Sequence, residues 1–213
     1  MLGVTRQSLR AALLDLTAEG LVERIPNRGA RVRVVTMDEA VAITECRMAL
    51  EALCAVKAAQ HISDDDAARL RELGGELRRA VAERNPLKYS ELNRELHRRI
   101  GVISGQAVAV SLLARLHAQI VRHQFQLALR PGRPEVSLPE HLAIIDAIAG
   151  RRPDDADQAV RRHLNSVIDA LRAAGDTTRE AAGAAARDAT AAAAGAAAGD
   201  TTGVAAGEAG QPV

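Results

Sequence analysis

Residues 90–99, SELNRELHRR, place two side chains with ligand chemistry four positions apart, Asn93 and His97. In a helix these positions lie on one face about one turn apart, so both side chains can reach the same point. His141 and His163 each lie in a separate run with helical patterning. Three imidazoles and an amide oxygen from three helices could converge inside a bundle, which is how metal sites are built in helical cores. Taken singly, a histidine is more often a surface or hydrogen-bonded core residue than a ligand, and spacing alone does not decide between the two.

The composition favours helices around an aliphatic core. Only 1% of the 213 residues are aromatic, so Leu, Ile, Val and Ala must fill the interior. The net charge of +1 neither favours nor excludes a polyanionic partner. Cys46 and Cys54 fall on one expected helix, roughly 12 Å apart along its axis, which is too far for a disulfide. The sequence shows no signal peptide and no membrane-spanning run, and therefore predicts a cytoplasmic protein without a membrane partner.

The first 35 residues predict one helix followed by a basic hairpin. Thr5 is a good N-cap for a helix over residues 6–19, and Gly20 provides its stop. Two short strands follow, over residues 21–25 and 30–35, joined by a turn that contains Gly29. A helix with exposed arginines next to an arginine-tipped hairpin has the layout of a recognition helix and a wing, which bind the major groove and phosphates of DNA. An ordinary protein surface with a few arginines fits the same pattern.

The next 139 residues predict a bundle of six helices. Their apolar spacing and end signals place them over residues 37–60, 64–85, 86–104, 107–129, 138–149 and 153–174. Capping boxes mark two starts, Thr36 with Glu39 and Ser137 with Glu140, and the second puts His141 in the first turn of its helix. Residues 175–213 are rich in Ala and Gly with almost no large apolar residue, so we expect a disordered tail with at most transient helix.

The N-terminal segment LGVTRQSLRAALLDLTAEGLVERIPNRGARV resembles the second half of the winged helix-turn-helix of GntR-type transcription regulators. The resemblance implies that four side chains at the start of the recognition helix face DNA, and that the wing tip approaches the minor groove. These positions are Thr5, Arg6, Ser8 and Arg10 on the helix and Arg28 and Gly29 in the wing. The family has further helices before this point, so we expect residues 1–35 to be an N-terminally truncated form of the domain.

The remainder resembles the FCD effector domain of the FadR-type branch of the same family. The matching stretches are ECRMALEALCA, NRELHRRI with SGQ, and PEHLAIIDAIAGRRPDDADQAVRRHLN. In that group an acidic residue and three histidines bind a divalent metal, which implies the ligand set Asn93, His97, His141 and His163, with Asn in place of the usual Asp. The implied metal is zinc, with nickel and manganese as alternatives. The resemblance also puts Arg47 on the wall of the effector pocket, although a surface ion pair with Glu51 at i+4 explains this arginine equally well.

Asn93 suggests the charge of the effector. Three neutral imidazoles and one amide would leave a dication uncompensated in a core of low dielectric. A carboxylate bound to the metal would restore the balance, and Arg47 would then hold its other end through two hydrogen bonds.

The implied protein is mainly α, with a partial winged helix-turn-helix (residues 1–35), a six-helix effector domain (36–174) and a tail (175–213). Its implied function is that of a metabolite-responsive, homodimeric transcription regulator that binds a double-stranded DNA operator and is not an enzyme. Two alternatives remain: a ligand-binding and dimerising fragment that does not bind DNA, and a metal-dependent hydrolase. Against the hydrolase, no acidic residue follows His141 or His163 at the position that a general base would need.

Overall fold

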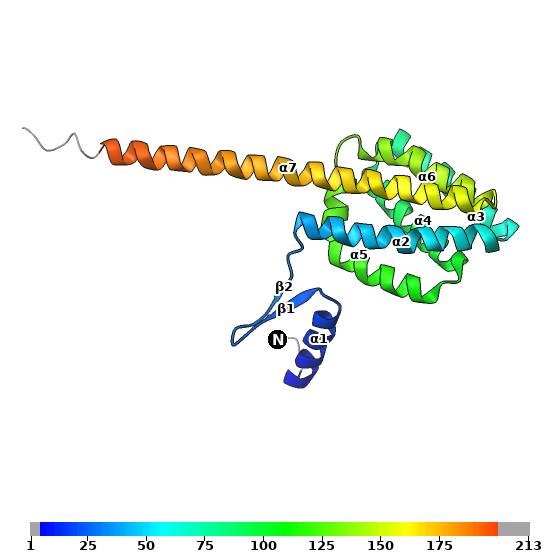
Figure 1. The fold of residues 1–213 in the computed structure, drawn as a ribbon, viewed down its shortest axis with the longest axis horizontal. Coiled ribbons are helices and arrows are strands. Elements are labelled where there is room, and N and C mark those ends of the chain that lie inside the picture. The colour runs from blue at the N-terminus through cyan, green and yellow to red at the C-terminus, as the bar shows by residue number, and fades with distance from the viewer. Residues whose placement is uncertain (1–4, 200–213) are drawn as a thin grey trace, which may run out of the picture. The chain divides into compact units, whose positions relative to one another are not determined.

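The computed structural model describes residues 5–199, which form seven helices and one two-stranded sheet (Figure 1). This mainly α architecture confirms the predicted fold class. In chain order the elements are α1 (Arg6–Ala18), β1 (Val22–Ile25), β2 (Gly29–Val32), α2 (Met37–His61), α3 (Asp64–Ala82), α4 (Pro86–Ser104), α5 (Ala107–Ala128), α6 (Arg133–Ala149) and α7 (Pro153–Gly199).

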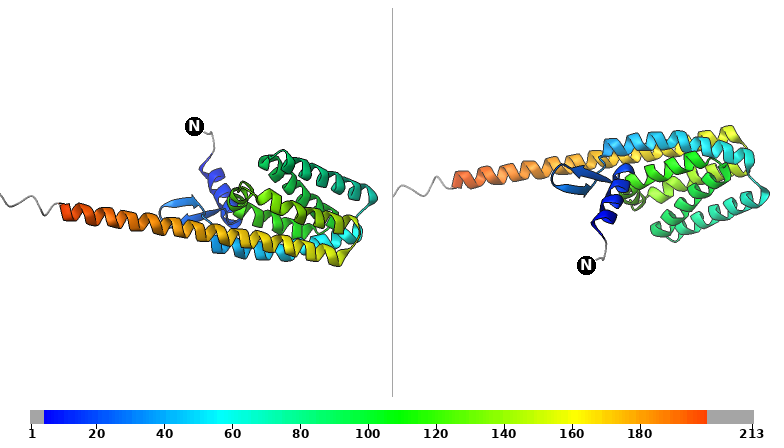
Figure 2. Two further views of the ribbon diagram at one scale, coloured as in Figure 1. Left: turned by 90° about the horizontal axis from the view of Figure 1, so that it is seen from above. Right: turned by 90° about the horizontal axis from the view of Figure 1, so that it is seen from below.

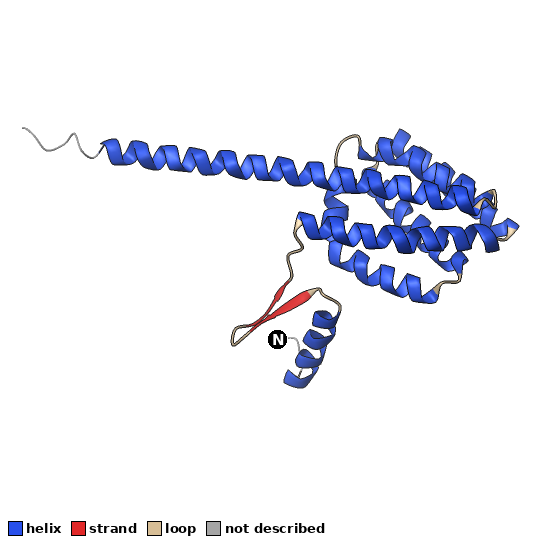
Figure 3. Ribbon diagram, viewed as in Figure 1, coloured by secondary structure: helices blue, strands red, loops and turns tan. Residues whose placement is uncertain are grey.

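The helix and hairpin expected at the start of the chain are both present (Figure 3). Thr5 caps α1, because its hydroxyl accepts a hydrogen bond from the backbone N–H of Ser8 at 3.1 Å. The two strands are antiparallel, and Glu23 pairs with Arg31 across them. Gly29 has φ +94°, a conformation that favours glycine, and it begins β2 directly after the turn.

The effector half is a helical bundle built around α2. This helix packs against α4, α5 and α6, and the views in Figures 1 and 2 both show it beside the first part of α7. Its inward positions carry alanine, which lets neighbouring helices approach closely, and larger side chains from those helices fill the core. The fully buried ones include Leu70, Leu77, Leu96, Ile144, Ile148 and Leu164. A second buried cluster joins Val41 and Ile43 to Ile168 and Leu171.

The sixth helix begins earlier than the sequence predicts. It starts at Arg133 after Gly132, whose φ is +80°, so the predicted start at a Ser137 capping box is wrong. Ser137 is buried within the helix, and Pro139 lies inside it at the cost of one backbone hydrogen bond. His141 is therefore about one and a half turns further from the helix start than expected, and it faces the core rather than an open first turn.

The last helix continues beyond the predicted end at residue 174, to Gly199. The prediction of a disordered tail is therefore wrong for residues 175–199, because alanine has the highest helix propensity and here outweighs the lack of apolar residues. Residues 200–213 lie outside the described part. Between residues 5 and 199, no helix is long and apolar enough to cross a membrane. Cys46 and Cys54 are both free thiols, as their spacing predicts.

Candidate metal centre and effector cavity

Three histidines from three different helices meet inside the bundle. His97 comes from α4, His141 from α6 and His163 from α7, and one nitrogen of each lies within 4.8 Å of the others. The ring centroids are 5.6 Å apart for His97 and His141, 5.6 Å for His97 and His163, and 4.3 Å for His141 and His163. His141 is 1% exposed and His163 is 4% exposed. The structure thus brings together the three imidazoles that the sequence singles out.

Each of the three rings has a polar neighbour at its Nδ1 atom. Glu51 Oε2 lies 2.9 Å from His97 Nδ1, the Tyr89 hydroxyl lies 2.8 Å from His141 Nδ1, and Glu140 Oε2 lies 2.8 Å from His163 Nδ1. Partners of this kind fix the orientation and tautomer of a metal-binding histidine. A carboxylate can only accept, so Glu51 and Glu140 favour the proton on Nδ1 and leave Nε2 of His97 and His163 for a ligand. The Tyr89 hydroxyl can donate or accept at His141 Nδ1, so this contact orients the ring, and Nε2 of His141 is buried without a hydrogen-bond partner.

Burial keeps two of the three imidazoles in the form that binds metals. It lowers the pKa of His141 well below the usual value, and the nearby His163 and His97 lower it further. It also lowers the pKa of His163, against the opposing effect of Glu140. A neutral imidazole has a free lone pair, so these rings need not lose a proton before coordination. Three such nitrogens within 4.8 Å of one another fit the donor set of a divalent transition metal.

Asn93 lines the same cavity as the three histidines. Its Oδ1 atom is buried and has no hydrogen-bond partner. A buried amide oxygen of this kind is costly unless a ligand or water satisfies it. This unpaired oxygen, one helical turn before His97, is available as a fourth donor.

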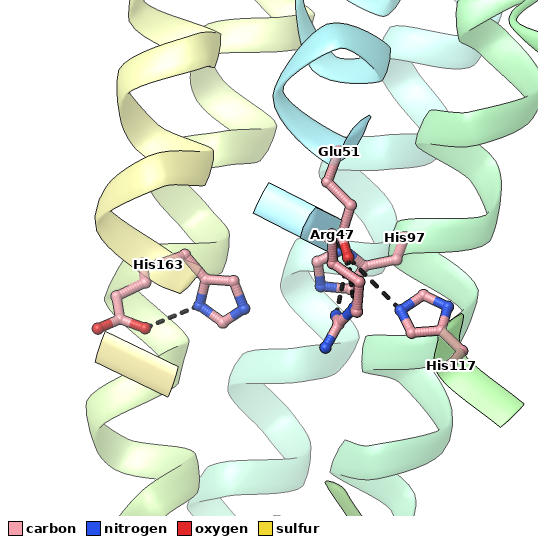
Figure 4. A network of polar contacts seen from close by, with 6 residues as sticks. Arg47, Glu51, His97, His117 and His163 are labelled. Carbon is pink, nitrogen blue, oxygen red and sulfur yellow. Dashed lines mark hydrogen bonds and ion pairs between the residues drawn. The ribbon is translucent and has the colours of Figure 1, made fainter. Parts of the chain in front are cut away.

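Arg47 combines the two roles that the sequence leaves open. It is 4% exposed and lines the cavity, and it also forms the expected ion pair with Glu51 (Figure 4). The pair is buried, so its prediction as a surface contact is wrong. Arg47 Nε and Nη2 both donate to Glu51 Oε1, at 3.0 and 2.7 Å, which excludes this edge from binding a ligand. Arg47 Nη1 is buried without a partner and is the one group left for an effector.

Glu51 is the site residue that the sequence analysis missed. It is 6% exposed, and besides Arg47 and His97 it contacts His117, whose Nε2 lies 3.4 Å from Oε1. Burial opposes its ionisation, yet Arg47 and His97 hold the pKa of Glu51 well below the usual value. The carboxylate therefore provides the negative charge that Asn93 lacks. It does so from behind His97, whose Nδ1 it contacts, and not as a direct neighbour of the proposed metal. Its position four residues after Arg47 was the available signal.

The cavity beside the histidines has a volume of about 760 Å³. Helices α2, α4, α5, α6 and α7 all contribute to its wall. The apolar part of the wall includes Ile100, Val110, Leu113, Val121, Phe125 and Val160. His117 lines the cavity, whereas His123 lies outside it and contacts the backbone carbonyl of Val35 at 2.8 Å. A mostly apolar chamber with a few polar groups at one cluster is typical of a small-molecule site.

Both halves of the chain match known protein families. The FCD domain family matches residues 42–166, more than half of the chain, and the family described as bacterial regulatory proteins, gntR family, matches residues 1–32. The chain belongs to the FCD-containing branch of the GntR family. It is a transcription regulator and not an enzyme, which removes the hydrolase alternative.

Curated relatives and solved structures of GntR regulators resemble the chain over most of its length. The HTH-type transcriptional repressor RspR of Escherichia coli is 26% identical over 169 residues, which are 79% of this chain and 74% of RspR. The repressor NanR of Cronobacter sakazakii is 27% identical over 191 residues, with 78% and 70% covered. The structure of E. coli McbR/YncC shares the fold with a TM-score of 0.67 at 18% identity, over 80% of this chain and 82% of that one.

The six positions that family resemblance assigns to DNA lie on α1 and the hairpin of this GntR regulator. Arg6 and Arg10 are exposed on α1, and Arg28 is exposed in the turn before Gly29. Thr5 and Ser8 are exposed as well, although their hydroxyls lie 2.8 Å apart and take part in the helix cap. The two hydroxyls therefore position the first turn of α1, while the arginines remain available for phosphates or bases.

Proposed function

We propose that this GntR regulator senses a small carboxylate through a divalent metal bound by His97, His141, His163 and Asn93. The observation that supports the metal most strongly is the common arrangement of the three rings, each with its Nδ1 beside a polar partner and its Nε2 left over. Zinc is the first choice, because three imidazole nitrogens with a further ligand are a common zinc set, and nickel or manganese is the alternative. When bound, the metal supplies a positive charge that attracts the effector's carboxylate.

The chain's own residues select and hold the effector. Glu51 accepts from Nε and Nη2 of Arg47 and so holds the guanidinium in place, while the buried Nη1 has no hydrogen-bond partner and can donate to a carboxylate. The wall of the cavity is mainly apolar, and its polar groups gather at the histidine cluster. A carboxylate with a partly apolar body matches this combination of groups.

Helix α5 is the element through which effector binding reaches the DNA-binding half. One face of α5 lines the cavity with His117, Val121 and Phe125. From the same helix, Gln119 Nε2 donates to the backbone carbonyl of Glu19 at 2.9 Å, just after α1, and His123 contacts the carbonyl of Val35. Movement of α5 on effector binding would change both contacts, and with them the affinity of a homodimer for its double-stranded operator in the cytoplasm. This coupling requires different effector affinities in the DNA-bound and free states.

A gel-shift titration tests the proposed function. The zinc-loaded protein is bound to DNA from upstream of its own gene, and a panel of small carboxylates is added with and without a chelator. We expect one carboxylate class to change the DNA affinity by about 5- to 150-fold, the usual range of allosteric coupling, and the effect to need the metal. If no carboxylate in a broad panel changes DNA binding, or the effect persists after metal removal and dialysis, the proposal is wrong.

A further inference from the structure

A second arginine lines the cavity with a buried nitrogen that has no hydrogen-bond partner and only a long ion pair. Arg133, the first residue of α6, has a side chain that is 11% exposed. Its Nη1 donates to the Ser166 hydroxyl at 3.0 Å, which fixes the guanidinium against α7. Its Nη2 is buried without a hydrogen-bond partner, and the nearest carboxylate oxygen, on Glu140, is 3.8 Å away. A buried charged N–H group is costly unless an acceptor meets it.

Arg133 and Arg47 lie next to different histidines of the cluster, each through an intervening carboxylate. Arg47 lies against Glu51, which contacts His97, whereas Arg133 lies near Glu140, which binds His163. Both arginines line the same cavity, and each has one terminal nitrogen left over. The cavity therefore presents two separate cationic donors, each beside a different histidine–carboxylate pair, rather than one.

We propose that the effector is a dicarboxylate, and that Arg133 binds its second carboxylate group. This inference rests on the proposed function, in which the metal and Arg47 receive the first carboxylate. Each arginine has one terminal nitrogen without a hydrogen-bond partner, and not the two parallel donors of a bidentate contact. A single donor of this kind suits one carboxylate oxygen. A phosphate group, with more oxygens and up to two charges, would remain under-coordinated at either arginine.

Binding measurements on the zinc-loaded protein test this inference. Straight-chain dicarboxylates of three to six carbons are compared with monocarboxylates of the same carbon number by isothermal titration calorimetry. We expect at least one dicarboxylate to bind about tenfold or more tightly than its monocarboxylate counterpart, the usual value of one charged hydrogen bond. Arg133→Gln should weaken this dicarboxylate by about 10- to 100-fold and leave monocarboxylate binding unchanged.

Two further variants keep the test decisive. Arg122→Gln removes an arginine that is exposed on α5 and does not line the cavity, so both ligand classes should bind it as they bind the wild type. Arg133→Lys keeps the charge if Arg133→Gln fails to fold, and it should retain part of the preference for dicarboxylates. Zinc content and melting temperature are measured for each variant to separate lost binding from lost structure.

The possible failures are distinguishable. Equal affinity for monocarboxylates and dicarboxylates, or an equal loss of both in an Arg133 variant that retains zinc, overturns the assignment of Arg133 and leaves the carboxylate sensor intact. If neither class binds the zinc-loaded protein, the proposed function and this inference are both wrong.

Discussion

Glu51→Gln should destabilise the effector domain more than any exposed charge substitution. Glu51 and Arg47 are 6% and 4% exposed, and three donor groups, from Arg47, His97 and His117, surround the carboxylate. Replacing the carboxylate by an amide leaves the guanidinium charge buried without compensation. Removal of one partner from such a pair costs about 3–5 kcal/mol. For a chain of this size, that loss lowers the melting temperature by roughly 6–20 °C.

Chemical denaturation of metal-free protein, with a chelator present, measures this effect without a contribution from metal binding. The matched control is Glu91→Gln, because Glu91 is exposed and its ion pair with Lys88, at 3.7 Å, should contribute less than about 1 kcal/mol. The double variant Arg47→Met with Glu51→Gln removes both charges. It should be more stable than the summed losses of Arg47→Met and Glu51→Gln predict, by about 2 kcal/mol or more. Strictly additive losses, or a cost below 1 kcal/mol for Glu51→Gln, would refute the reasoning.

The stability of Glu51→Gln should depend less on pH in the acidic range than that of the wild type. The pKa of Glu51 is lowered in the folded state, so its stabilising effect is complete above the unfolded-state pKa of about 4.3 and is lost as the pH falls through the folded-state value. The stability difference between wild type and Glu51→Gln should therefore be constant at neutral pH and should shrink below about pH 4. A difference that grows on acidification would contradict the direction of the shift.

Three other substitutions test the orientation of His141, the contact between α5 and the DNA-binding half, and the proline inside α6. Tyr89→Phe removes the hydroxyl at His141 Nδ1 and should weaken metal binding by about 10- to 100-fold in a chelator competition, whereas unchanged affinity would show that this contact does not orient the ring. Gln119→Ala breaks the contact between α5 and the segment after α1. The affinity for the effector should stay the same, while the effector's influence on DNA binding, measured by gel shift, should fall. An unchanged influence in the variant would exclude this route. Pro139→Ala restores a backbone donor inside α6 and should raise the free energy of unfolding by about 1–3 kcal/mol in urea titration, and a loss of stability would mean that the proline ring packs favourably.

Local signals in the sequence were sufficient to predict most helices. The start of α2 is defined by Thr36 and that of α3 by Ser63, whose side chains accept the expected backbone hydrogen bonds. Pro86 and Gly105 bound α4 at the predicted residues. These signals act within one turn of the chain, so they need no knowledge of tertiary packing.

The errors occurred where tertiary packing outweighs local signals. Ser137 and Glu140 have capping-box spacing, but Ser137 is buried and Glu140 binds His163 instead of a backbone donor. Glu51 follows Arg47 at the spacing of a surface pair, and only the convergence of α2, α4 and α5 makes the pair internal. Sequence spacing could suggest the histidine cluster, because three patterned helices each carried one inward imidazole, but the partners at Nδ1 depend on contacts between helices.

The zinc content of purified protein is the direct test of the proposed metal centre. Wild type and the variants His97→Ala, His163→Ala and His61→Ala are stripped with chelator, reloaded with Zn²⁺, desalted and measured by elemental analysis. His61 is exposed at the end of α2 and lies outside the cavity, so it is the matched control. We expect about one zinc per chain in wild type and His61→Ala, and little or none in the other two variants. Equal zinc in all four proteins, or none in any, would contradict it.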